Sequence, residues 1–353
     1  MLRRLFTECI LKPQDLAPSH EELEILSTFN PGVADLGGEV VLLVRVAERP
    51  TERREGYTAL PRWDPKHGVI IDWVSNDELI PIDPRVVEFK RTGIKRLTFV
   101  SHLRALRSRD GRTVEPADIG PRFVPDSECE EYGVEDPRIT RIGDTFYFTY
   151  VAVSRHGAAT ALASTRDFQT YNHHGIIFPP ENKDVLLFPG RVLGDYVALH
   201  RPNPSTYFAT PEMWIARSPD LINWGHHRHF LGGRSGWELG RIGGGTPPIL
   251  FEGGWLEIYH GNNKDPIRPG VGVYSAGAIL MDLEDPGRII AHTDGPIMVP
   301  EVDFEKEGFL AEIVFPTGIV DRDETLRVYY GAADTYTGVV GYSKEDLATA
   351  LKG

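Results

Sequence analysis

The chain has 353 residues, 41% of them hydrophobic and 25% charged, which is ordinary for a globular protein and long enough for a sizeable core. Its 51 acidic and 38 basic residues give a net charge of −13, which argues against nucleic acid or an anionic membrane as a partner. Only Cys9 and Cys129 occur, which excludes a disulfide framework and a paired-cysteine zinc site and makes a reducing compartment the default expectation.

The N-terminal stretch MLRRLFTECILKPQDL is interrupted by polar residues, so it is too polar for the apolar core of a signal peptide. No long uncharged apolar run follows anywhere in the sequence. We therefore expect a cytoplasmic protein without a membrane partner. Residues 1–28 are expected to form an N-terminal extension with one short helix, which begins at Ser19 because this serine is followed three residues later by a glutamate.

Beyond residue 28, runs of branched and aromatic residues alternate with clusters of Gly, Pro, Asp and Asn, the pattern of β-strands and turns. The clearest runs are VVLLVRVAE, RLTFVSHLRAL, DTFYFTYVAV, YVALHRP, EMWIARS, GWLEIYHGN, GVYSAGAILM and LRVYYGAAD. Residues 49–96 interrupt the first group of strands and are expected to be an insertion. Helical periodicity returns only at residues 344–351.

The strands recur as a unit that consists of a strand with a polar motif, a turn, a long central strand and two further strands. Units begin near Asn30, Asp136, Phe188, Thr246 and Phe315. The later starts are separated by roughly 50 to 70 residues, as expected for propeller blades of four strands. We therefore predict an all-β chain whose residues 1–353 form a single five-bladed β-propeller domain. The motif residues of all blades would then face one axial pocket.

The segment Gly133-Val134-Glu135-Asp136-Pro137-Arg138 opens one of these units. Proline fixes its own φ and disfavours the helical region for the residue before it, so we expect Asp136 to be extended and its carboxyl to be aimed. A carboxyl held beside a second acid and an arginine is suited to protonate a leaving group. A turn aspartate that caps a backbone amide is the structural alternative.

Several motifs in order resemble glycoside hydrolase family 130, the five-bladed β-propeller β-mannoside phosphorylases and β-mannosidases. They are GVEDPR, NKDVLLFPGRVLGDYVALHRP, SPDLINW, GGWLEIYHG and YYGAAD. The resemblance extends from Asn30 to the C-terminus. It implies an inverting enzyme with Asp136 as the general acid, which acts directly or through a sugar hydroxyl. It also implies a β-linked manno-oligosaccharide and inorganic phosphate as substrates, α-mannose 1-phosphate as a product, and no cofactor.

Phosphorolysis requires fewer protein groups than hydrolysis. An inverting hydrolase needs an acid and a base, whereas phosphate is already an anionic nucleophile, so one acid and a cluster of cations suffice. The resemblance assigns the phosphate contacts to Lys183, Arg201, His260 and Tyr274. The Lys183-Asp184 pair and Leu199 differ from the more strongly phosphorolytic branch of the family and indicate a second branch, which also contains phosphorylases.

For the sugar, the resemblance assigns the ring whose bond is broken to Asn30, Arg45, Arg241 and Asp334. Fixed donors and acceptors of this kind distinguish one hydroxyl orientation from another. Arg138 is expected to orient Glu135 or Asp136.

Two other functions remain open. A hydrolase on the same scaffold would need a base, for which Glu181 and Glu312 are available, and a non-catalytic propeller would bind glycans or proteins without turnover. The paired histidines of HHGIIF and HHRHF would lie on opposite strand faces, so we predict no metal site. The sequence does not distinguish β-1,2 from β-1,4 linkages, and it leaves acceptor length and a homo-oligomeric assembly open.

Overall fold

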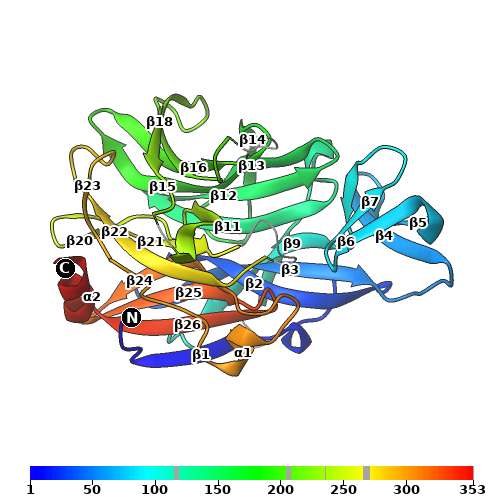
Figure 1. The fold of residues 1–353 in the computed structure, drawn as a ribbon, viewed down its shortest axis with the longest axis horizontal. Helices are drawn as coiled ribbons and strands as arrows, with labels where there is room; N and C mark the ends of the chain where they lie inside the picture. The colour runs from blue at the N-terminus through cyan, green and yellow to red at the C-terminus, as the bar shows by residue number, and fades with distance from the viewer. Residues whose placement is uncertain (115–118, 204–207, 235, 265–270, 353) are drawn as a thin grey trace.

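The computed structural model describes residues 1–114, 119–203, 208–234, 236–264 and 271–352. This part of the chain contains 26 β-strands and two short α-helices (Figure 1), so the prediction of an all-β chain is confirmed. None of the described helices is both long and apolar enough to cross a bilayer.

Most strands form five antiparallel groups, which we call units one to five in chain order. Unit one contains β2 (Leu23–Asp35), β3 (Val40–Pro50), β9 (Val100–Ser108) and β10 (Ile119–Phe123). Unit two contains β11 (Gly133–Ile142), β12 (Thr145–Ser154), β13 (Gly157–Thr165) and β14 (Asn172–Phe178). A parallel contact between Gly133 and Ser101 joins these two units into one eight-stranded sheet.

The other three units are separate sheets. Unit three contains β15 (Asn182–Val192), β16 (Asp195–Pro202), β17 (Met213–Ser218) and β18 (Gly225–Leu231). Unit four contains β19 (Arg241–Gly243), β20 (Ile249–Phe251), β21 (Gly254–Asn262), β22 (Tyr274–Met281) and β23 (Ile289–His292). Unit five contains β24 (Val314–Arg322), β25 (Thr325–Ala332), β26 (Tyr336–Ser343) and β1 (Phe6–Leu11).

The expected insertion at residues 49–96 forms two small sheets between β3 and β9. They are β4 (Tyr57–Asp64) with β5 (Gly68–Ser75), and β6 (Leu79–Asp83) with β7 (Val86–Phe89) and β8 (Lys95–Leu97). Leu60, Leu79 and Val87 give the insertion a small apolar core of its own. In Figure 1 it lies at one end of the molecule.

The N-terminal segment differs from its prediction. No helix begins at Ser19; its hydroxyl contacts the Glu48 carboxylate instead, and β2 starts at Leu23. A helix of about eight residues is marginal by itself, and pairing of β2 with β3 buries Leu23. Within the predicted extension, β1 pairs with β26 (Figure 1), so both ends of the chain share unit five.

The C-terminal helix is confirmed as α2 (Lys344–Lys352), whose Leu347, Ala348 and Leu351 are buried against units four and five. The other α-helix, α1 (Asp303–Lys306), is a single turn. The other helical segments among the described residues are 3₁₀ turns at Pro13–Asp15, Asn76–Glu78, Glu128–Glu130 and Gly236–Glu238.

Apolar side chains fill the space between neighbouring units. Leu186 and Leu199 of unit three, for example, pack with Ile242 and Tyr259 of unit four. This packing brings the first strands of the units together: β11 contacts β2, β15 and β24. The motif residues on these strands, far apart in sequence, therefore meet in one region.

Candidate active site

A cavity of about 310 Å³ lies where the first strands meet. It is lined by eight of the predicted site residues, Asn30, Arg45, Asp136, Lys183, Arg201, Arg241, Tyr274 and Asp334. The other two, Arg138 and His260, are buried directly behind its wall. The structure thus brings the predicted acid, cations and sugar-binding groups into one place.

A β-bulge of the same kind positions three of the polar residues. In β2, β11 and β15, one extra residue is inserted relative to the partner strand, which makes a β-bulge. The bulges contain Asn30, Asp136 and Asp184, whose φ angles are 48°, 49° and 54°. Each bulge interrupts the strand pairing at the end of the unit that meets the cavity.

The prediction of an extended Asp136 is therefore wrong. Strand pairing on both sides of the bulge overrides the preference that Pro137 imposes, and Asn30 adopts the same conformation before Pro31. A positive φ costs about 1–3 kcal/mol per residue, and Asn and Asp tolerate it better than most residue types. The residue types that suit this chemistry also suit this backbone.

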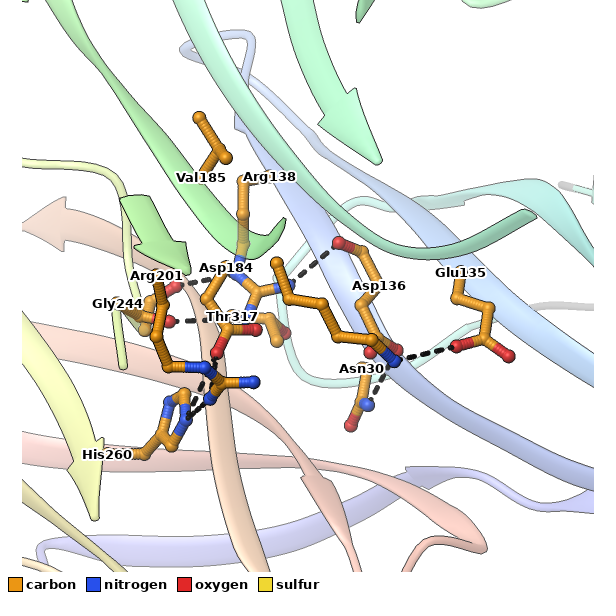
Figure 2. Close-up of polar contacts among 12 residues, drawn as sticks. Asn30, Glu135, Asp136, Arg138, Asp184, Val185, Arg201, Gly244, His260 and Thr317 are labelled. Atoms are coloured by element: carbon orange, nitrogen blue, oxygen red, sulfur yellow. Dashed lines mark hydrogen bonds and ion pairs between the residues drawn. The ribbon is translucent and has the colours of Figure 1, made fainter. Parts of the chain in front are cut away.

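Asp136 lies at one end of the site in a dense hydrogen-bond network, which we call the acid end. Asn30 Nδ2 donates to Asp136 Oδ1 at 2.8 Å, and Arg45 Nη1 donates to the same oxygen at 2.9 Å. Arg45 also bonds Glu135 Oε1 at 2.6 Å through Nη2 and Ser101 Oγ at 3.2 Å through Nε. Figure 2 shows Glu135, Asp136 and Asn30 gathered on this side.

Two opposing effects set the protonation of Asp136. Burial works to raise its pKa, but the positive charges of Arg45 and Arg138 and the hydrogen bond from Asn30 outweigh burial and hold the pKa below its ordinary value. With the cavity in this state, Asp136 is a carboxylate at neutral pH.

Arg201, Asp184 and His260 form the opposite end, which we call the cation end (Figure 2). Arg201 Nη1 lies 2.5 Å from Asp184 Oδ2 and 3.3 Å from His260 Nε2, and that imidazole nitrogen lies 3.4 Å from the same carboxylate oxygen. Burial alone would raise the pKa of Asp184, but Arg201 and His260 hold it far below its usual range. Asp184 therefore stays charged and fixes Arg201.

His260 is placed differently from the other predicted phosphate ligands. It is 0% exposed and does not line the cavity, whereas Lys183, Arg201 and Tyr274 do. Burial lowers the pKa of His260 despite the adjacent Asp184 carboxylate. A neutral imidazole behind Arg201 can position the guanidinium without adding charge.

Lys183 connects the two ends, because its Nζ lies 3.9 Å from Glu135 Oε2 and its side chain is 29% exposed. Tyr274 and Arg241 line the cavity from β22 and β19. The Tyr274 ring lies edge-on to Phe315 with ring centres 6.1 Å apart.

Arg138 acts on the backbone of the bulge. Its Nη1 donates to the Asp136 carbonyl at 2.7 Å and its Nε donates to the Gly245 carbonyl at 2.8 Å. Arg138, which was expected to orient Glu135 or Asp136, holds the main chain of Asp136 and ties unit two to unit four.

Glu257 is a buried acid that sequence reasoning missed. Its Oε1 accepts a hydrogen bond from Gly245 N at 3.2 Å, and burial raises its pKa to about 8. Glu257 is therefore mostly protonated at neutral pH, even though the nearby charge of Arg138 lowers its pKa. The single charged letter in the apolar run GWLEIYHG was the available signal.

Asp334 and Arg85 both line the cavity, and each is among the charges that act on the other. Asp334 has a φ of 47°, and burial raises its pKa to about 6 even though Arg85 and Arg45 lower it. Arg85 comes from the turn between β6 and β7 of the insertion. It belongs to no motif, so no sequence pattern indicated a role for it.

The candidate bases for hydrolysis are placed unequally. Glu181 lines the cavity, and its Oε1 accepts a hydrogen bond from Ala158 N at 3.1 Å. Glu312 does not line the cavity.

One group of potential metal ligands occurs among the described residues, away from the cavity. Atoms of Asp126, Glu130 and His173 lie within 4.8 Å of one another. The Glu130 carboxylate already accepts hydrogen bonds from Tyr150 OH at 2.7 Å and Asp126 N at 2.8 Å. The absence of a metal site remains a prediction.

Comparison with known proteins identifies relatives along almost the whole chain. A family model for glycoside hydrolase family 130, described as β-1,4-mannooligosaccharide phosphorylase, matches residues 74–352. A β-1,2-mannobiose phosphorylase of Listeria innocua is 41% identical over 332 residues, which cover 92% of this chain and 91% of that protein. A 1,2-β-oligomannan phosphorylase of a Thermoanaerobacter species is 36% identical over 253 residues, which cover 70% of this chain and 81% of that protein.

The fold agrees with these sequence relationships. The solved structure of the Listeria innocua enzyme in complex with β-1,2-mannobiose superposes with a TM-score of 0.90 at 38% identity and covers 97% of each chain. The predicted resemblance is confirmed, and the chain belongs to glycoside hydrolase family 130.

Proposed function

We propose that this enzyme phosphorolyses β-1,2-linked mannosides with inversion and releases α-mannose 1-phosphate and a sugar acceptor shortened by one residue. The observation that carries the proposal is one cavity that brings the Asp136 carboxyl, held by Asn30 and Arg45, together with the cations Lys183 and Arg201. The linkage is proposed from the names of the Listeria innocua relative and of its solved structure, each of which covers more than nine tenths of this chain.

In the proposed reaction a phosphate oxygen forms a bond to the anomeric carbon while the bond from that carbon to the glycosidic oxygen breaks. The glycosidic oxygen takes the proton of Asp136, directly or through a sugar hydroxyl. Lys183 and Arg201 hold the phosphate on the opposite side of the ring, with Tyr274 beside them and His260 behind Arg201. Asn30, Arg45, Arg241 and Asp334 bind the mannose hydroxyls.

Asp136 must be protonated when the glycosidic bond breaks, and bound phosphate favours the protonated form by raising its pKa. Lys183 is among the charges that lower the pKa of Asp136. A phosphate dianion on Lys183 neutralises that charge and adds a negative one nearby, and both changes raise the pKa of Asp136. Phosphate binding and protonation of the acid are therefore coupled.

We also propose that units one to five surround a single axis as a five-bladed β-propeller. Three features support this arrangement: the shared bulge in three first strands, the contacts of β11 with β2, β15 and β24, and the use of β1 to complete unit five. A closed ring explains why the motif residues share one cavity.

The test is the dependence of turnover on phosphate. We expect incubation with β-1,2-mannobiose and inorganic phosphate to yield α-mannose 1-phosphate and mannose in equal amounts, with little reaction when phosphate is omitted. Release of mannose at the same rate without phosphate would instead establish a hydrolase, with Glu181 as the base to examine. If neither β-1,2- nor β-1,4-mannobiose reacts, the enzyme proposal fails.

A further inference from the structure

The insertion reaches the active site through one turn. Between β6 and β7 the chain runs Asp83-Pro84-Arg85-Val86, and both Arg85 and Val86 line the cavity, as does Leu97 of β8. In sequence these residues lie between β3 and β9 of unit one, and they line the same cavity as Asp334 of unit five. The insertion is therefore part of the cavity wall.

The turn holds the Arg85 side chain in a defined geometry. Asp83 Oδ1 accepts hydrogen bonds from Arg85 N at 2.8 Å and Nε at 3.3 Å, and Asp83 Oδ2 accepts one from Nη2 at 2.9 Å. This fork leaves Nη1 without a hydrogen bond to any described residue. A planar guanidinium fixed on two sides presents its remaining donor in one direction.

The main chain of the turn is also fixed to the unit-one framework. Thr98 Oγ1 donates to the Pro84 carbonyl at 2.8 Å, and Thr98 N donates to the Arg85 carbonyl at 2.9 Å. Thr98 directly precedes Phe99, which lines the cavity. The position of Arg85 is thus coupled to the active-site wall and not only to the outer part of the insertion.

The charge of Arg85 acts on Asp334, one of the residues assigned to the sugar. Among the charges that act on Asp334, Arg85 and Arg45 lower its pKa, and Asp136 and Glu135 raise it, against the larger effect of burial, which raises it. Arg45 is already committed to Glu135 and Asp136 by hydrogen bonds at 2.6 and 2.9 Å. Arg85 is the cation that remains to balance Asp334.

We propose that Arg85 is a substrate-binding residue: its free guanidinium edge donates to a mannose hydroxyl that Asp334 also binds, so the insertion sets sugar affinity and specificity. A carboxylate and a guanidinium on one wall suit a hydroxyl, which donates to the first and accepts from the second. The proposal rests on the proposed phosphorolysis and deepens it by assigning a role to the insertion.

Arg85→Ala is compared with Arg85→Lys and with a matched control, Arg62→Ala. Arg62 is an insertion arginine of similar exposure, 27% against 31%, that pairs with Asp72 at 3.0 Å and does not line the cavity. The Michaelis constants for β-1,2-mannobiose and for inorganic phosphate are measured separately across pH 4.5 to 8, and the melting temperature of each variant is recorded.

For Arg85→Ala we expect the KM for mannobiose to rise roughly 10- to 100-fold, as for loss of a charge-assisted hydrogen bond, with the KM for phosphate changed less than about threefold. Loss of the positive charge of Arg85 raises the pKa of Asp334. The acidic limit, which is the pH below which mannobiose affinity declines, should therefore move to higher pH. Arg85→Lys should restore this limit but not the affinity, and Arg62→Ala should leave all these values unchanged.

Unchanged mannobiose affinity in a folded Arg85→Ala variant would overturn the proposal, and so would an equal rise in both Michaelis constants, which would place Arg85 on the phosphate. Failure of the proposed function is a separate result: the wild-type enzyme would then release mannose without phosphate, whatever the effect of Arg85.

Discussion

Units one and three use the same local structure with opposite results. Both have a bulge in the first strand, and in both the second strand carries an arginine opposite the residue before the bulge: Arg45 opposite Phe29, and Arg201 opposite Lys183. The bulge residue itself differs, because unit one has Asn30 where unit three has Asp184.

That single difference decides what each arginine does. Asp184 binds Arg201 within its own unit at 2.5 Å, so its charge is partly balanced and its position fixed. Asn30 carries no charge, so Arg45 reaches across to unit two and binds Glu135 and Asp136. One amide in place of a carboxylate therefore separates the acid end from the cation end.

The largest expected effect comes from Asp136→Asn, which removes the acid and keeps the size and the acceptor for Asn30. We expect kcat/KM for mannobiose phosphorolysis to fall roughly 10²- to 10⁴-fold, the usual contribution of a general acid. Mannobiose binding, measured by calorimetry, should stay within a few fold. An active Asp136→Asn enzyme would contradict the assignment of the acid end.

Asn30→Asp tests the comparison next, since it gives unit one the composition of unit three. A second carboxylate beside Asp136 competes for Arg45, so we expect the pKa of the acid to rise and a larger fraction of the acid to be protonated at neutral pH. The measurement is the pH profile of kcat/KM, whose alkaline limb reports loss of the proton from the acid and should move to higher pH by about one unit. Asn30→Ser, which adds no charge, is the control, and an identical profile for both variants would refute the electrostatic explanation.

Asp184→Asn is the reciprocal change and should affect phosphate rather than sugar. Arg201 loses its ionic partner, so we expect the KM for phosphate to rise about tenfold, in line with a charged hydrogen bond. The KM for mannobiose should change much less. A change confined to mannobiose would contradict the placement of phosphate at Arg201.

The smallest effect is expected for Glu257→Gln. Glutamine mimics the protonated form of this buried acid, which accepts a hydrogen bond from Gly245 N. A folded-state pKa of about 8 against an unfolded value near 4.3 means that the stability contributed by the bound proton is lost as pH rises between these values. Glutamine does not titrate, so the melting temperature of the variant relative to wild type should increase from pH 5 to pH 8. A constant difference would show that Glu257 is ionised in the folded protein.

The sequence predicted the strands and most residues of the site, but it did not predict the backbone conformation of those residues. Recurrent motifs located the strands, the segment GVEDPR indicated Asp136, and the resemblance to glycoside hydrolase family 130 assigned Lys183 and Arg201. Backbone conformation was not predicted in the same way: Pro137 indicated an extended Asp136, and the bulge that overrides it depends on pairing with β12.

The depth of individual side chains and the contribution of the insertion to the cavity were also not predicted from the sequence. His260 and Arg201 have the same position in their strands, opposite Gly243 and Lys183, yet only Arg201 lines the cavity, since packing around unit four covers the histidine. Arg85 lies in a turn without a motif, and only the folded insertion shows where it points.

The most direct measurement is a crystal structure of the wild-type enzyme grown with inorganic phosphate. We expect an anion in contact with Lys183 and Arg201, at the opposite end of the cavity from the Asp136 carboxyl. An anion bound instead at Arg45 and Arg85, beside the acid, would contradict the division of the site on which the account depends.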